Sequence, residues 1–119
     1  MRTKQAIGRQ SRAHGHAWER EVAEVLKVIW PAAVRNLSQT RSASKEGCDI
    51  LGTPFWVEAK AGRKVDVKAA WKQAEADRMD HELRQPMRPI LLVVKEHHRR
   101  PFVVCTFTTR RIEIGRAHV

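Results

Sequence analysis

The amino-acid sequence predicts an α/β or α+β domain in which one β-sheet is flanked by α-helices. Two observations predict it. Apolar residues recur at helical spacing near the N-terminus, and short apolar runs bounded by turn residues follow, among them "FWVEA" and "ILLVV". The chain of 119 residues is long enough for one domain with a single core.

The first helix is expected from Gly15 to about Ile29. Apolar residues recur there at spacings of three and four, namely Trp18, Val22, Val25, Leu26 and Ile29. Pro31 is expected to end it. Residues 1–14 contain four cations and no acid, so we expect a basic, flexible arm. This arm is either a solvated tail or a segment that binds nucleic acid.

The later elements are predicted from turn signals and apolar runs. Residues 33–37 are expected to form a short edge strand, and "DILGTPFWVEAK" at 49–60 a hairpin with a four-residue loop. A second helix is expected over 67–84, with Asp66 as its N-cap. The last two expected strands cover 90–94 and 101–107.

The charge is strongly positive, with 23 Lys and Arg against 13 Asp and Glu and a net charge of +10. Nucleic acid is the commonest partner for such an excess, and a ribosomal or membrane-surface role is the alternative. The two cysteines lack zinc-site spacing. With no signal peptide or membrane-spanning run recognised, we expect a cytoplasmic, intracellular protein with reduced thiols and no membrane partner.

The last six residues, "IGRAHV", resemble one reading frame of a common sequencing-library adapter. We therefore expect 114–119 to be a non-native tail, and the alternative is that these six residues are genuine. The expected domain then covers 15–113.

Two carboxylates and an ammonium are predicted to meet on the hairpin. If Ile50 faces Val57, then Asp49 faces Glu58, and Lys60 shares their side of the sheet because side chains alternate along a strand. Two such carboxylates repel unless a cation lies between them. Mg²⁺ suits that position, and it would activate water and polarise a phosphate. The alternative is a surface salt bridge at the strand ends.

The first helix offers a further acid. At about 100° per residue, Glu19 lies beside Leu26 at the margin of the apolar arc, whereas Glu21 and Glu24 lie outside it. Glu19 is therefore the acid expected to face the sheet and to serve as a third metal ligand, directly or through water. The alternative is an ordinary flanking acid paired with a Lys or Arg.

Three stretches together resemble the PD-(D/E)XK nuclease superfamily, and within it the archaeal Holliday-junction resolvases and small phage proteins like them. They are "GHAWERE" at 15–21, "RSASKEGCDI" at 41–50 and "VEAK" at 57–60. The resemblance covers 15–107. It implies an α/β fold with a mixed central β-sheet flanked by α-helices, a restriction-endonuclease-like core with the order α-β-β-β-α-β-β.

The resemblance also implies roles for individual residues. Asp49 and Glu58, with the backbone carbonyl of Ala59, would bind Mg²⁺ or Mn²⁺, Lys60 would act on the water or the phosphate, and Glu19 would complete the metal site. A glutamine on the following helix often approaches this site in related nucleases, and Gln73 is the matching position. The superfamily's proline is absent, because Cys48 stands in its place.

Contacts with DNA phosphates are expected from two loops that flank the hairpin. Those in the polar loop before it are Arg41, Ser44 and Lys45. Those after it, for which a solvated loop is the alternative, are Arg63, Lys64 and Lys68.

Other residues are expected to be structural. Three tryptophans, Trp18, Trp56 and Trp71, are expected in the core rather than as base-stacking platforms. His97 and His98 are expected in a solvated turn. Cys105 is expected to be packed within a strand.

The sequence therefore favours a metal-dependent endodeoxyribonuclease that hydrolyses phosphodiester bonds in branched or structured DNA. A homodimer acting in DNA recombination in a bacterial or phage-infected cell is expected. A basic nucleic-acid-binding module without catalysis is the main alternative. A structural ion-pair cluster in a protein unrelated to DNA would leave the net charge of +10 unexplained.

Overall fold

A computed structural model describes residues 4–37, 47–82 and 88–106, with side chains from Gly15 onward. The chain order is α-β-β-β-α-β-β, as predicted. The elements are α1 (Lys4–Leu26), β1 (Val34–Arg35), β2 (Ile50–Leu51), β3 (Trp56–Gly62), α2 (Val67–His81), β4 (Ile90–Glu96) and β5 (Phe102–Cys105). The predicted edge strand, hairpin, second helix and last two strands all form, with shifted ends.

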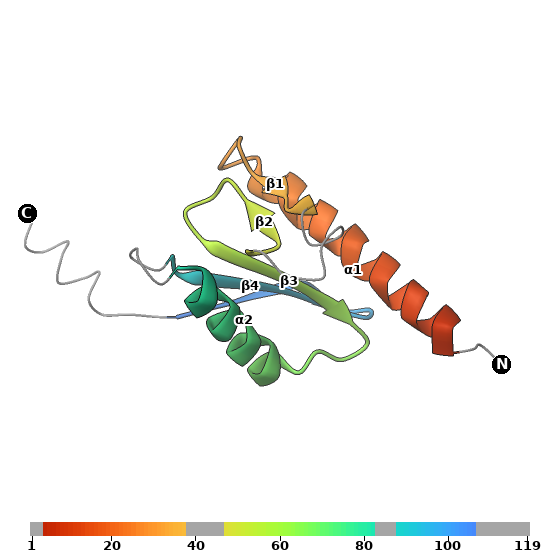
Figure 1. Cartoon of the computed structure of the whole chain (residues 1–119). Helices are drawn as coiled ribbons and strands as arrows, with labels where there is room; N and C mark the ends of the chain where they lie inside the picture. Colours follow the sequence, from red (N-terminus) through yellow and green to blue (C-terminus); the bar gives the residue numbers. More distant parts are fainter. Residues whose placement is uncertain (1–3, 38–46, 83–87, 107–119) are drawn as a thin grey trace, which may run out of the picture.

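The five strands form one mixed sheet in the order β1-β2-β3-β4-β5. β3 and β4 are parallel and are connected through α2, whereas the other neighbouring pairs are antiparallel. The sheet lies between α1 and α2 (Figure 1). The prediction of an α/β fold with one mixed sheet flanked by helices is confirmed.

The hairpin has the predicted register, since Ile50 pairs with Val57. Its loop is the predicted four residues, 52–55, between the two strands. Gly52 makes the turn possible, because its φ is +83° and a Cβ there would lie 2.1 Å from the carbonyl oxygen of Ala32. This register brings the charged residues of the two strands to the same side of the sheet.

The ends of α1 differ from the prediction. The helix begins at Lys4 rather than Gly15, because the basic segment is rich in good helix formers and contains no proline. It ends at Leu26, and Val25 and Ile29 are 68% and 67% exposed instead of buried. The buried face extends toward Ala23 instead, so the expected apolar arc was wrong on one side.

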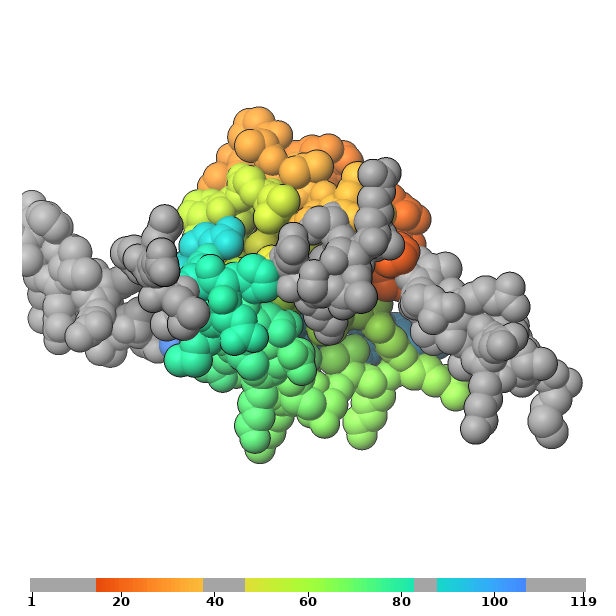
Figure 2. Space-filling view, viewed as in Figure 1, coloured from red at the N-terminus to blue at the C-terminus, as the bar shows by residue number. Residues whose placement is uncertain are grey.

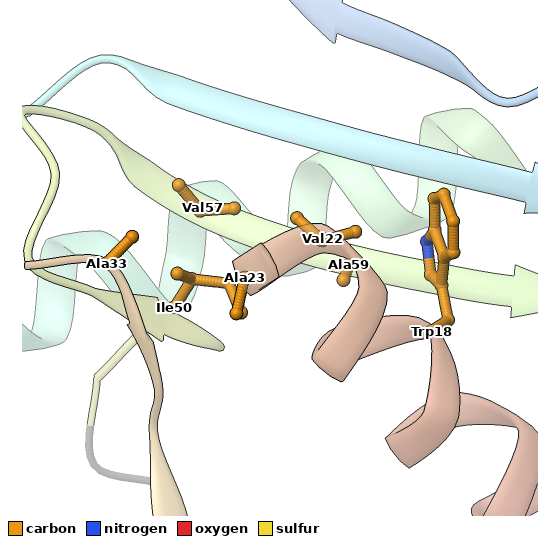
Figure 3. Close-up of a cluster of buried hydrophobic side chains, with 7 residues drawn as sticks. All are labelled: Trp18, Val22, Ala23, Ala33, Ile50, Val57 and Ala59. Carbon is orange, nitrogen blue, oxygen red and sulfur yellow. The ribbon is translucent and has the colours of Figure 1, made fainter. Parts of the chain in front are cut away.

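The core has two parts, one on each face of the sheet, because successive strand residues point to opposite faces. The part between α1 and the sheet (Figure 3) consists of Trp18, Val22, Ala23, Ala33, Ile50, Val57 and Ala59. The part on the α2 side consists of Cys48, Trp56, Ala74 and Ile90, with the half-buried Trp71 packed against it. The prediction that the three tryptophans contribute to the core is confirmed.

Three local predictions can be compared with the structure. Asp66 caps α2, and its Oδ1 accepts a 3.0 Å hydrogen bond from the Ala69 N–H, as predicted. His97 and His98 are exposed in a turn, also as predicted. Cys105 is exposed, so the prediction that it is packed was wrong: β5 is an edge strand whose surface lacks a covering element among the described residues.

None of the described helices has the length and apolar character that crossing a membrane requires. In the space-filling view, α2 lies across the lower front of the molecule (Figure 2). α1 packs on the opposite face of the sheet from α2. Side chains of β3 therefore contact α1 on one face and α2 on the other.

Candidate functional site

Asp49 lies immediately before β2 and is 7% exposed. Its backbone N–H donates to the Val57 carbonyl at 2.9 Å, and its Oδ2 accepts from the Ala59 N–H at 2.8 Å. The side chain thus continues the β2–β3 ladder where the backbone of β2 has turned away. This bond fixes the carboxylate at the edge of β3.

Glu58 is 6% exposed on the α2 side of β3. Its Oε1 accepts a 2.9 Å hydrogen bond from Trp56 Nε1. Burial, the Asp49 charge and a hydrogen bond between the two carboxyl groups raise the pKa of Glu58 to about 8, against the opposing effects of Trp56 and Lys60. The predicted meeting of Asp49 and Glu58 is therefore present, and without a cation the pair retains a proton near neutral pH.

Lys60 follows on the same face of β3 and is half-buried. Its positive charge is near enough to lower the pKa of Glu58. Within the described part of the chain, Lys60 takes part in no ion pair. Its ammonium is therefore available to an anion that enters beside the two carboxylates.

Glu19 on α1 lies close to Asp49 but is held by another residue. Arg35 Nε donates to Glu19 Oε2 at 2.9 Å, and each of these two side chains is only 15% exposed. Burial first, and the Asp49 charge second, raise the pKa of Glu19, while Arg35 and His16 oppose the shift. The structure thus places Glu19 near Asp49 and adds an arginine, and its role as a third metal ligand stays a prediction.

The contacts of Trp56 with Glu58 and of Arg35 with Glu19 were not predicted from the sequence. The signal for Trp56 was present, because residues two apart on a strand share a face and Trp56 precedes Glu58 by two. Arg35 had no such signal. It lies opposite Ile50 in the β1–β2 ladder, and only the packing of α1 over β1 brings it to Glu19.

Gln73 is not brought to the carboxylates. It is exposed on α2 and donates a 2.9 Å hydrogen bond to Asp77 Oδ1, while its neighbour Ala74 is the residue that packs toward the sheet. This departs from the prediction based on related nucleases. A glutamine would need to occupy the position of Ala74 to face β3.

The predicted phosphate contacts fall into two groups. Arg41, Ser44 and Lys45 lie outside the described residues. Arg63, Lys64 and Lys68 are exposed, in the connection after β3 and in the first turn of α2.

The donor set fits a hard divalent cation. Asp49 and Glu58 supply carboxylate oxygens, and the Ala59 carbonyl lies on the same edge of β3 as the N–H that Asp49 binds, because both groups of a strand residue point to one side. Within 15–37, 47–82 and 88–106, no group of three or more His, Cys, Asp or Glu side chains is arranged to hold a metal. Glu19 would have to reorient from Arg35, or act through water, to be a third ligand.

The arrangement combines the two buried acids, the half-buried Lys60, which forms no ion pair within the described residues, and the arginine-bound Glu19 near Asp49. Such a set can bind a cation and can stabilise negative charge on a phosphate. Comparison of the chain with protein-family models, with curated proteins and with solved structures found no match.

Proposed function

We propose that this protein is a metal-dependent endodeoxyribonuclease with a restriction-endonuclease-like core of the PD-(D/E)XK type. The observation that supports it best is the burial of Asp49 and Glu58 against each other, with Lys60 on the same face. Two buried like charges destabilise a fold unless a cation or a proton lies between them. A bound divalent cation would relieve this repulsion, so the arrangement is suited to a metal site.

In this proposal Asp49, Glu58 and the Ala59 carbonyl hold Mg²⁺ or Mn²⁺. The bound ion would supply a polarised phosphoryl oxygen and a water of lowered pKa. The Ala59 N–H orients Asp49, and the Trp56 indole orients Glu58. Lys60 stabilises the negative charge that develops on the phosphate or positions the attacking water.

The proposed substrate is branched or otherwise structured DNA, such as a four-way junction, cut by a homodimer during recombination in a bacterial or phage-infected cell. The net charge of +10 supports a polyanionic substrate. The choice of branched DNA rests on the resemblance of "GHAWERE", "RSASKEGCDI" and "VEAK" to the junction resolvases. Arg63, Lys64 and Lys68, with Arg41, Ser44 and Lys45, would contact phosphates.

The test is a gel assay on four-way junction, flap, linear duplex and single-stranded DNA, each with Mg²⁺, Mn²⁺ or EDTA. We expect metal-dependent cleavage that is lost in Asp49→Ala, Glu58→Ala and Lys60→Ala, while DNA binding is retained. Lys72→Ala, an exposed cation on α2, is the matched control. Cleavage retained in any two of the three variants would overturn the proposal.

A second candidate is a basic nucleic-acid-binding module without catalysis. One observation favours it: Glu19 is paired with Arg35 rather than joining the other two acids. Titration of Mn²⁺ into the protein, followed by calorimetry, separates the two functions. Heat of binding that disappears in Asp49→Ala supports the nuclease, and its absence supports the binding module.

A further inference from the structure

Two loops are joined at one end of the sheet. The His97 N–H donates to the Gly62 carbonyl at 2.9 Å, which carries the β3–β4 ladder into the β4–β5 turn. The Val65 N–H, in the connection from β3 to α2, donates to Glu96 Oε2 at 2.8 Å. Figure 1 shows this connection and this turn at the end of the sheet toward which the β3 arrow points.

These loops gather exposed cations, which we call the basic end: Arg63, Lys64, Lys68, Arg99 and Arg100. None of them forms an ion pair with any residue in the described parts of the chain. The two acids of the same region bond to backbone N–H groups and form no ion pair with these cations. Glu96 accepts from the Val65 N–H and Asp66 from the Ala69 N–H. The positive charge of the basic end is therefore left for a partner.

The charges of α2 change along the helix. In the second half of α2, which leads away from the basic end, acids predominate, namely Glu75, Asp77 and Asp80. The acids of α2 therefore lie in the half of the helix that leads away from the basic end.

The basic end is continuous with the candidate site. Lys60 precedes Gly62 by two residues on β3, and the Gly62 carbonyl is the group that holds the β4–β5 turn. In the space-filling view, the lime-green segment between β3 and α2 projects from the surface (Figure 2). An anion bound by Lys60 therefore has further cations next to it along the same end of the sheet.

We propose that the basic end binds the phosphate backbone of duplex DNA and that Arg99 and Arg100, in the β4–β5 turn, are part of this surface. The choice of DNA rests on the proposed function. Backbone contacts of this kind position a duplex without reading its sequence. These contacts would hold the DNA in a defined position relative to Asp49 and Glu58, at the end of the sheet formed by the β3–α2 connection and the β4–β5 turn.

A membrane surface fits this region less well. Membrane-surface segments combine cations with large apolar side chains that enter the lipid. Of the exposed large hydrophobic residues in the described chain, none lies between 60 and 68 or between 95 and 100, and the nearest are Phe102 and Val103 at the start of β5. The loops of the basic end themselves thus carry cations without large exposed apolar side chains.

The test is fluorescence anisotropy of a labelled linear duplex, in EDTA, over a series of salt concentrations. Each phosphate contact contributes about 0.9 to the slope of log affinity against log salt, so Arg99→Gln/Arg100→Gln should reduce the slope by about 2. Arg99→Lys/Arg100→Lys keeps the charge and should preserve the slope. Lys27→Gln, which removes a cation paired with Glu24 at the other end of α1, should also leave the slope unchanged.

An unchanged slope in the glutamine pair overturns the proposal, provided circular dichroism shows a folded protein. Should that pair not fold, Arg63→Gln/Lys64→Gln replaces it, with the same expected loss and the same contrary result. Vesicles containing phosphatidylserine serve as a second probe, and binding that depends on Arg99 and Arg100 for vesicles but not for DNA also overturns the proposal. Because EDTA prevents metal-dependent cleavage, the outcome is independent of the gel assay on Asp49, Glu58 and Lys60.

Discussion

The indole N–H of Trp56 donates a 2.9 Å hydrogen bond to the carboxylate of Glu58, two residues further along β3. Trp56 is fully buried, with the Arg88 guanidinium 5.4 Å from its ring centroid and the His81 ring at 5.7 Å. Its orientation is therefore fixed by packing. The hydrogen bond transmits that orientation to an acid that we propose as a metal ligand.

Trp56→Phe keeps an aromatic side chain but removes the N–H donor and the second ring of the indole, so it also leaves a cavity in the core. We expect the pKa of Glu58 to rise further, since the indole bond lowers it, and Mn²⁺ affinity to fall by about 10–100-fold, as for other groups that orient metal ligands. Calorimetry measures the affinity. In ¹H–¹⁵N spectra, the indole signal that is missing from the variant should be the one that shifts when Mg²⁺ is added to the wild type.

Trp18→Phe is the control for this variant. Its indole donates at 3.1 Å to the Val93 carbonyl, away from the carboxylates. We expect it to keep the wild-type Mn²⁺ affinity. Equal affinities in Trp56→Phe and the wild type would show that the indole does not prepare Glu58 for a metal.

The raised pKa of Glu58 predicts how stability depends on pH without metal. Burial and the Asp49 charge raise this pKa from 4.5 to about 8, so the folded state binds the proton more tightly than the unfolded state. The contribution is complete below pH 4.5 and is lost as the pH rises through about 8. The loss is at most about 5 kcal/mol, at 1.36 kcal/mol per pKa unit.

Urea unfolding in EDTA at several pH values between these limits checks this prediction. The free energy of unfolding should decrease with pH in the wild type and decrease less in Glu58→Gln, which cannot lose a proton. Mg²⁺ should restore stability at the upper end, because it takes the place of the proton. Equal pH dependence in both proteins would contradict the shift.

The ion pair between Arg35 and Glu19 predicts an energetic coupling. The side chains are 15% exposed and 2.9 Å apart, so Arg35→Gln leaves a half-buried acid beside Asp49 without its cation. We expect the pKa of Glu19 to rise and the free energy of unfolding to fall by about 1–3 kcal/mol. A double-mutant cycle with Glu19→Gln should give a coupling of about 0.5 kcal/mol or more. Simple additivity would mean that the pair is energetically neutral.

Gln73→Ala is expected to have little effect. Gln73 is exposed and bonds to Asp77, away from the acids of β2 and β3. Stability should change by less than about 0.5 kcal/mol, and Mn²⁺ affinity and DNA cleavage should remain at the wild-type level. A tenfold loss of cleavage would assign Gln73 to the site after all.

Several features of this molecule follow from chemistry that is local in the chain. The alternation of side chains in "DILGTPFWVEAK" predicts the Ile50–Val57 register and the face shared by Asp49, Glu58 and Lys60. Asp66 is recognisable as an N-cap because its side chain bonds a backbone N–H three residues on. These elements depend on short-range periodicity and hydrogen bonding, which residue order alone encodes.

The sequence by itself determined the strand register, the helix cap, the mixture of helices and strands, and the excess of positive charge. Tertiary packing alone decided which face of α1 is buried, that Cys105 is exposed on an edge strand, and that Arg35 from β1 binds Glu19 from α1. The physical reason is that each of these depends on the distance between segments remote in the chain. Such distances depend on how the helices pack on the sheet, and the hydrophobic periodicity within one segment does not predict them.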